Sequence, residues 1–68
     1  MTSPEEYYED LFPRFEEEIR AVINGSYSLD LLLSQVEEYL GDYPDIDGSY
    51  PSIICDWLVE EIEYQSRH

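Results

Sequence analysis

The sequence contains no lysine, and its three arginines stand against seventeen aspartates and glutamates in a chain of 68 residues. The formal net charge is −14. A surface of one sign repels itself and disfavours the compact state, so protein surfaces usually mix both signs. Such a charge argues against direct binding to nucleic acid or to an anionic membrane surface, because both are negative. It indicates instead a basic protein as the partner.

Cysteine is also scarce, since Cys55 is the single cysteine of the chain. No disulfide can form within the chain, which is typical of a reducing compartment. Residues 1–6 are acidic rather than basic and apolar, so we expect no signal peptide. No apolar run approaches the roughly 20 residues that a membrane-spanning helix needs. We therefore expect a cytoplasmic location, in the host cell if a phage encodes the protein.

The chain has the composition of a folded domain rather than of an acidic tail. Hydrophobic residues make up 43% of it and aromatic residues 15%, whereas disordered acidic tails are poor in both. A chain of this size buries only about 60% of the surface that its unfolded form exposes, so its stability is marginal and dimerisation would help. We expect one acidic helical domain over residues 1–68, with a homodimer left open.

The first predicted helix covers about residues 3–24. Residues 3–6 carry a capping pattern for its start, and Gly25 predicts a left-handed end. Pro13 interrupts the helix because it lacks a backbone donor and clashes with the preceding turn, so we expect a kink or split near residues 10–12. An apolar stripe keeps its helical phase across Pro13, at Tyr8, Phe12, Phe15, Ile19 and Val22.

Two further helices are predicted at about residues 28–40 and 51–65, joined by a loop at 41–50 that is rich in glycine, proline and aspartate. The third helix has an apolar face wide enough to pack against both of the others. No segment alternates as a strand does. We therefore expect an all-α fold, a compact three-helix domain whose first helix is kinked or split at Pro13. The stripe of the second helix is Leu29, Leu32, Leu33, Val36 and Leu40.

No constellation for catalysis or metal binding stands out. Residues 45–48 resemble part of a calcium loop, but two ligand positions then fall on Tyr43 and Ile54, so we expect a turn with local hydrogen bonds. His68 is the single histidine, which leaves a metal site or triad without a second member. Cys55 has acidic neighbours that raise the pKa of a thiol. We expect no enzyme, no metal and no cofactor.

Acidic residues occur on every predicted segment, and several stand near the C-terminal ends of the second and third helices, where the helix dipole favours cations. Carboxylates three or four residues apart on a helix lie about 5–6 Å from each other, close to the scale of phosphate spacing. This placement opposes stability and indicates a binding role. The predicted acidic partner-binding surface comprises Glu5, Glu6, Glu9, Asp10, Glu16, Glu17, Glu18, Glu37, Glu38, Asp42, Asp45, Asp47, Asp56, Glu60, Glu61 and Glu63.

Aromatic side chains form the second part of the predicted surface. Carboxylates pair with a guanidinium group while a ring face stacks on it, so tyrosine among carboxylates suits an arginine-rich partner. We expect about half of the seven tyrosines to lie at the edge of the core instead. The predicted aromatic contacts are Tyr7, Tyr43, Tyr50, Trp57 and Tyr64.

These features predict a small non-catalytic inhibitor that imitates nucleic acid. It would occupy the basic groove of a nuclease, a CRISPR effector, a restriction enzyme or a DNA-binding regulator. In size and composition the chain is similar to phage-encoded anti-CRISPR and anti-restriction proteins, although no sequence motif ties it to a family.

Two alternatives are kept. Residues 47–52, Asp-Gly-Ser-Tyr-Pro-Ser, are similar to the Tyr-Tyr-Pro segment before the last helix of colicin nuclease immunity proteins, which are also small, acidic and helical. That resemblance implies an immunity protein or antitoxin that neutralises a cationic nuclease toxin. Here only Tyr50 precedes Pro51, and the chain is shorter than in that family. The other alternative is a halophilic assembly domain, acidic for solubility, which would fold only in molar salt.

Overall fold

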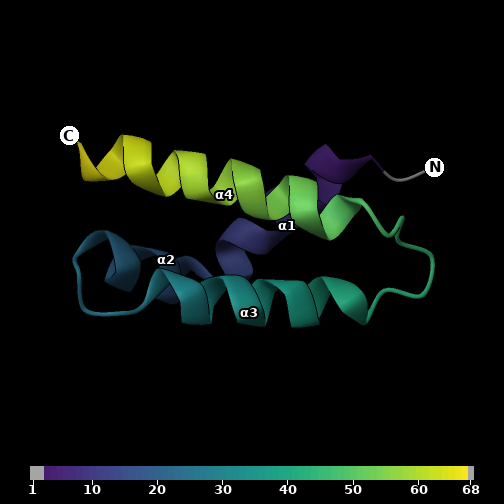
Figure 1. The fold of residues 1–68 in the computed structure, drawn as a ribbon, viewed down its shortest axis with the longest axis horizontal. Coiled ribbons are helices and arrows are strands. Elements are labelled where there is room, and N and C mark those ends of the chain that lie inside the picture. Colours follow the sequence, from purple (N-terminus) through teal and green to yellow (C-terminus); the bar gives the residue numbers. More distant parts are fainter. Residues whose placement is uncertain (1–2, 68) are drawn as a thin grey trace.

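The computed structural model describes residues 3–67, and within that range it contains four α-helices and no strand. These are α1 (Pro4–Arg14), α2 (Glu16–Ile23), α3 (Leu29–Gly41) and α4 (Tyr50–Ser66). In Figure 1, α3 and α4 run along the long axis, with α1 and α2 behind them. The Cα atoms extend over 35 × 19 × 18 Å. The all-α prediction is confirmed, and no helix in the described part is long and apolar enough to cross a bilayer.

The prediction of three helices is wrong in its count, because the first segment, expected as a helix kinked or split at Pro13, folds as two separate helices. The break falls at Phe15, whose φ is −113° and ψ 21°, and not at residues 10–12. Pro13 lies inside the last turn of α1, so the helix continues past the proline before it ends. The Phe15 N–H still donates to the Leu11 carbonyl at 2.9 Å, and the Phe15 carbonyl accepts from the Ile19 N–H at 2.9 Å. The chain therefore changes direction at Phe15 without giving up either of these bonds.

The buried stripe of this segment explains why the break is there. Its members recur at every fourth residue: Tyr7, Leu11, Phe15 and Ile19. In a straight helix a step of four residues turns the side chain by roughly 40° beyond a full turn, so such a stripe winds away from the core. The break at Phe15 resets the direction between α1 and α2. The predicted stripe members Tyr8, Phe12 and Val22 are only half-buried and pack against the edge of this core.

The other two helices bury apolar residues at helical spacing, although Leu29 and Leu33 of the stripe predicted for α3 are only half-buried. α3 buries Leu32, Val36 and Leu40, and α4 buries four residues, namely Ile54, Cys55, Leu58 and Ile62. α4 contacts α1, α2 and α3, which confirms the prediction that the last helix is central. Every large, fully buried side chain in the described part is aliphatic, so the core is held by apolar contacts alone.

A glycine-dependent turn ends α2, as predicted. Gly25 has φ +81°, in the left-handed region that side chains disfavour. The Gly25 N–H donates to the Val22 carbonyl at 3.0 Å, and the Ser26 N–H donates to the Ala21 carbonyl at 2.8 Å. This pair of bonds is the Schellman motif, which satisfies carbonyls at a helix end. It directs the chain from α2 toward the start of α3.

Two glycine substitutions test this account. Gly25→Ala should lower the free energy of unfolding by about 1 kcal/mol, because alanine at a positive φ is strained. Gly41→Ala is the matched control, since Gly41 lies in α3 without a positive φ and a Cβ there meets nothing within 4 Å. It should raise stability by about 0.5 kcal/mol. Urea denaturation followed by circular dichroism measures both, and equal effects of the two changes would contradict the assigned turn.

Candidate functional site

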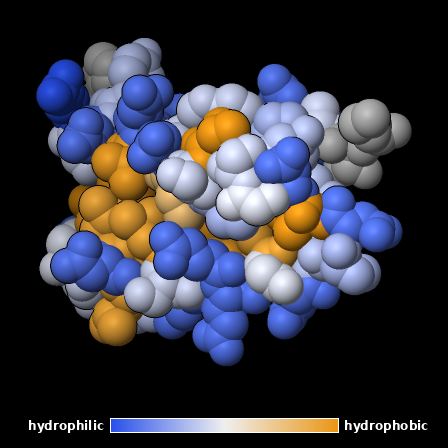
Figure 2. All heavy atoms as spheres, turned by 45° about the vertical axis from the view of Figure 1, so that its right-hand side comes forward, coloured by the Kyte–Doolittle hydropathy of each residue, from blue (hydrophilic) through white to orange (hydrophobic). Residues whose placement is uncertain are grey.

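The predicted acidic surface lies on the outside of the molecule. All of its residues are exposed except Glu18 and Glu61, which are half-buried. Figure 2 shows hydrophilic residues over most of the visible face, interrupted by a larger hydrophobic area toward the left of the view. Every helix and the loop between α3 and α4 contribute carboxylates. Four come from α1, three from the start of α2, two from α3, three from the loop and four from α4.

Few of these carboxylates are neutralised within the chain. Among residues 3–67, the one ion pair joins Arg20 Nη2 to Glu16 Oε1 at 2.8 Å, and both side chains are exposed. Such exposed pairs contribute about 0–1 kcal/mol. Arg14 instead places its guanidinium carbon 4.5 Å from the centre of the Tyr39 ring. The surface therefore presents its negative charge to solvent and to any partner.

The charge is dense along the molecule. Fourteen net negative charges over a longest extent of 35 Å amount to one charge per about 2.5 Å. Duplex DNA carries one per about 1.7 Å of axis, and one of its strands carries one per about 3.4 Å. The linear charge density of this protein thus falls between those of a single strand and a duplex.

The break at Phe15 changes the account of three acids. Glu16, Glu17 and Glu18 occupy the first turn of α2 rather than the middle of a long helix. The dipole at a helix N-terminus favours negative charge, so these three stabilise α2. Acids were also predicted at the C-terminal ends of helices, where the helix dipole disfavours negative charge. This holds for Glu38 and Glu63, which lie in the last turns of α3 and α4, and neither turn carries a basic residue. These two acids are the ones whose position stability does not explain.

The predicted aromatic residues separate into three environments. Tyr7 is 9% exposed and belongs to the core, so its side chain is largely withdrawn from the surface on which it was placed. Tyr43, Tyr50 and Trp57 are half-buried. Tyr64 is 62% exposed. Tyr64 is therefore the most exposed of the five, while the half-buried rings offer part of one face or edge.

Five of the rings form an aromatic cluster where the loop, α1, α3 and the start of α4 meet. Its members are Tyr7, Phe15, Tyr39, Tyr43 and Tyr50, which meet edge to face with ring centres 5.1 to 6.1 Å apart. The hydroxyls of Tyr39 and Tyr43 share a hydrogen bond of 2.8 Å. That bond and desolvation raise the pKa of Tyr43, with the Asp10 carboxylate adding to the effect. Sequence reasoning missed Tyr39 and Arg14, whose contact depends on α1 and α3 lying together.

A pocket opens beside this cluster, and we call it the Tyr43 pocket. It has a volume of about 340 Å³. Its lining consists of two rings, one proline and two carboxylates, namely Tyr7, Tyr43, Pro44, Asp10 and Asp45. Among residues 3–67, no basic residue lines it. The pocket joins α1 to the loop, and it brings together four of the residues that the sequence predicted as partner contacts.

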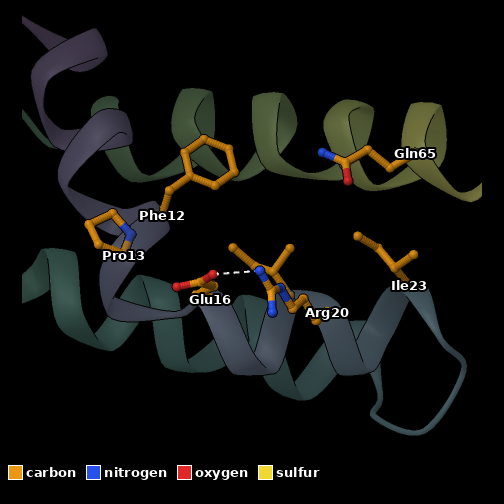
Figure 3. A pocket seen from close by; sticks show the side chains of 7 residues that line it. Phe12, Pro13, Glu16, Arg20, Ile23 and Gln65 are labelled. Atoms are coloured by element: carbon orange, nitrogen blue, oxygen red, sulfur yellow. Dashed lines mark ion pairs between the residues drawn. The ribbon is translucent and has the colours of Figure 1, made fainter.

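A second hollow, the Phe12 groove, lies between the α1–α2 break and the end of α4 (Figure 3). In Figure 3, Phe12 and Gln65 project into the space, and the Glu16–Arg20 ion pair lies along its α2 side. Glu16 is the sole carboxylate of the lining, and it is paired. The lining of the groove is thus mainly apolar. It does not contain the pair of carboxylates that general acid–base catalysis between two acids would need. Its lining residues are Phe12, Pro13, Glu16, Ile19, Arg20, Ile23 and Gln65.

The loop aspartate Asp47 has the local role that was predicted for it. Its carboxylate accepts hydrogen bonds from the Ser49 N–H at 2.9 Å and from the Ser49 hydroxyl at 2.7 Å. These bonds lower the pKa of Asp47. Within residues 3–67, no three histidine, cysteine, aspartate or glutamate side chains gather as metal ligands would. His68 lies outside the described residues.

Cys55 is buried in α4, and burial together with the nearby carboxylates of Glu37 and Asp56 raises the pKa of its thiol to about 11. The thiolate is the nucleophile, so the folded protein holds this sulfur in its unreactive form at neutral pH. The raised pKa agrees with the effect expected from the acidic neighbours of Cys55, and burial adds to it.

Alkylation by iodoacetamide at pH 8 tests this environment. The ordinary pKa of the thiol is 9.0, and raising it to about 11 lowers the thiolate fraction roughly a hundredfold. We expect very slow labelling of the folded chain and fast labelling in urea, read by mass spectrometry. Equal labelling rates in the two conditions would contradict the burial of Cys55.

No family model, curated protein or solved structure matches this chain.

Proposed function

We propose that the protein is a small, non-catalytic inhibitor that binds the basic nucleic-acid-binding surface of another protein as a nucleic-acid mimic. Its target class is a nuclease, CRISPR effector, restriction enzyme or DNA-binding regulator in the cytoplasm of a host cell. An anti-CRISPR or anti-restriction protein encoded by a phage or mobile element has this role. Homodimerisation, which the sequence leaves open, stays a prediction.

The observation that carries the proposal is the linear charge density. The protein carries one net charge per about 2.5 Å along an axis of 35 Å. This spacing is similar to that of the nucleic acid which a basic groove binds. A protein acidic only for solubility has no need of this density on so short an axis. Electrostatic complementarity of this kind speeds encounter and selects the partner.

The position of the acids supports the same proposal. Glu38 and Glu63 stand at helix ends that favour cations, and the described part of the chain pairs neither with an arginine. Lysine at either position would stabilise its helix by about 0.3–1 kcal/mol. Retaining glutamate there costs stability, and binding to a basic surface provides a reason for that cost.

A second candidate is an immunity protein or antitoxin for a cationic nuclease toxin. The observation in its favour is that Tyr50 and Pro51 stand at the start of the last helix, next to the place before that helix where colicin nuclease immunity proteins have their similar segment. Tyr50 is half-buried against Tyr7, with ring centres 6.1 Å apart, and leaves part of its ring for a partner. Such a protein would bind one toxin without having to imitate its substrate.

Competition with nucleic acid separates the two candidates. The chain is immobilised, a host lysate is passed over it, and the captured protein is identified and purified. A mimic loses this partner to duplex DNA or RNA, and its affinity falls steeply between about 0.05 and 0.5 M salt, as screening shortens the range of the interaction. A partner that stays bound in excess nucleic acid, and that depends on Tyr50 or Trp57, would favour the immunity protein and overturn the mimic.

Charge reversal at the two helix ends gives a sharper test. Glu38→Lys with Glu63→Lys should weaken binding to the purified partner by at least about tenfold while raising the free energy of unfolding by about 0.5–1 kcal/mol. Calorimetry and urea denaturation measure the two effects.

The neutral pair Glu38→Gln and Glu63→Gln is the matched control and should give intermediate values. Binding that is unchanged in both double variants would show that the acids at these ends take no part. A fall in stability would contradict the assigned helix ends.

A further inference from the structure

We propose that the Tyr43 pocket receives the guanidinium group of an arginine side chain from the basic partner. This inference rests on the proposed function for its partner, and it adds a defined anchor point to a surface otherwise described only by charge. The pocket lies between α1 and the loop, and its lining combines aromatic rings with carboxylates that come from both segments.

The first argument is the chemistry of the lining. A guanidinium group is planar and cationic, with five N–H donors, and it binds by stacking on a ring while pairing with carboxylates. Asp10 and Asp45 supply two carboxylates, and Tyr43 and Tyr7 supply ring surface. Both aspartates are exposed, and neither forms an ion pair within residues 3–67. Their acceptor oxygens are therefore available to a cation from outside.

The second argument is a guanidinium that the chain already holds on the same cluster. Arg14 lies over the ring of Tyr39 at 4.5 Å, and Tyr39 is joined to Tyr43 by ring contact and by a hydroxyl hydrogen bond of 2.8 Å. Asp42 lies beside these residues in the hollow that Arg14 lines. On the Tyr39 side, the cluster thus holds a guanidinium over a ring, and a carboxylate lines the same hollow. The Tyr43 pocket repeats that combination of groups with no arginine of the chain in its lining.

The third argument is size and rigidity. A volume of about 340 Å³ is at the lower end of the roughly 300–1,000 Å³ of small-molecule pockets, which suits one side chain rather than a helix. The Tyr7 ring is buried and meets Tyr43 edge to face at 5.1 Å, so the wall is anchored in the core. A fixed wall reduces the entropy lost on binding.

The test uses the full chain alone, with N-acetyl-L-argininamide as the probe and the uncharged N-acetyl-L-citrullinamide as its control. The probe is titrated in low salt, and amide and aromatic NMR shifts are followed. We expect saturable shifts at residues 7, 10, 43 and 45 with argininamide only. Equal shifts with citrullinamide would overturn the proposal, because charge would then play no part. Shifts centred on Arg14 would also overturn it, since the probe would then be competing for Tyr39.

Two charge-matched double variants complete the test. Asp10→Asn with Asp45→Asn should raise the dissociation constant of argininamide at least about tenfold. Asp30→Asn with Asp56→Asn removes two exposed acids outside the pocket lining and should change it less than about twofold. Equal weakening in both would mean that the general field attracts the probe, and the pocket assignment would fail.

Two further comparisons identify the source of the arginine and separate the proposals. Shifts at residues 43 and 45 that grow with protein concentration, without any probe, would assign the pocket to a second copy of this chain and overturn the choice of occupant. The probe measurement needs no partner. It can therefore fail while nucleic acid still competes for the partner, or succeed where that competition fails.

Discussion

The apolar contact of α4 with the other three helices is the interaction on which the rest of the structure depends. Seventeen acids repel one another across the surface, and the described chain offsets them with one exposed ion pair. Compactness therefore comes from Leu58, Ile54 and the aliphatic side chains that close around them from α1 and α3. Hydrophobic contact does not depend on the charge of the surface. The surface can therefore be strongly acidic as long as the apolar core outweighs the repulsion between its carboxylates.

The apolar core holds the fold together while the surface carries the charge, and the arrangement of the helices serves both. The break at Phe15 folds the N-terminal segment back so that a four-residue stripe stays on the core, and the same break gives Glu16, Glu17 and Glu18 a helix start of their own. The aromatic cluster then joins α1, α3, the loop and the start of α4. Acids that help the fold and acids that work against it are thus found on the same molecule, and the second kind carry the functional argument.

Features set by neighbouring residues in the chain could be predicted from the sequence, whereas contacts between distant segments could not. α3 and α4 were predicted to within about one residue at each end, because leucine and isoleucine spacing and flanking glycine and proline are features of the chain itself. The first segment held two overlapping apolar stripes that share Phe15 and Ile19, and periodicity could not choose between them. Exposure of the carboxylates followed from residue type. The burial of Tyr7 could not be predicted in this way, because tyrosine occurs both in cores and on surfaces. The contact of Arg14 with the Tyr39 ring could not be predicted either, because it requires α1 and α3 to meet.

The anchoring of Tyr7 and its neighbours in the core has a further consequence, which concerns entropy. An acidic chain without a core would have to order its backbone on reaching a partner, at a cost of roughly 1–2 kcal/mol for each residue fixed. Here the backbone is already ordered in the folded chain, and Asp10 and Asp45 already line one pocket in the absence of a partner. Buried residues such as Leu11 of α1 thereby hold in place the carboxylates that the proposed binding would use.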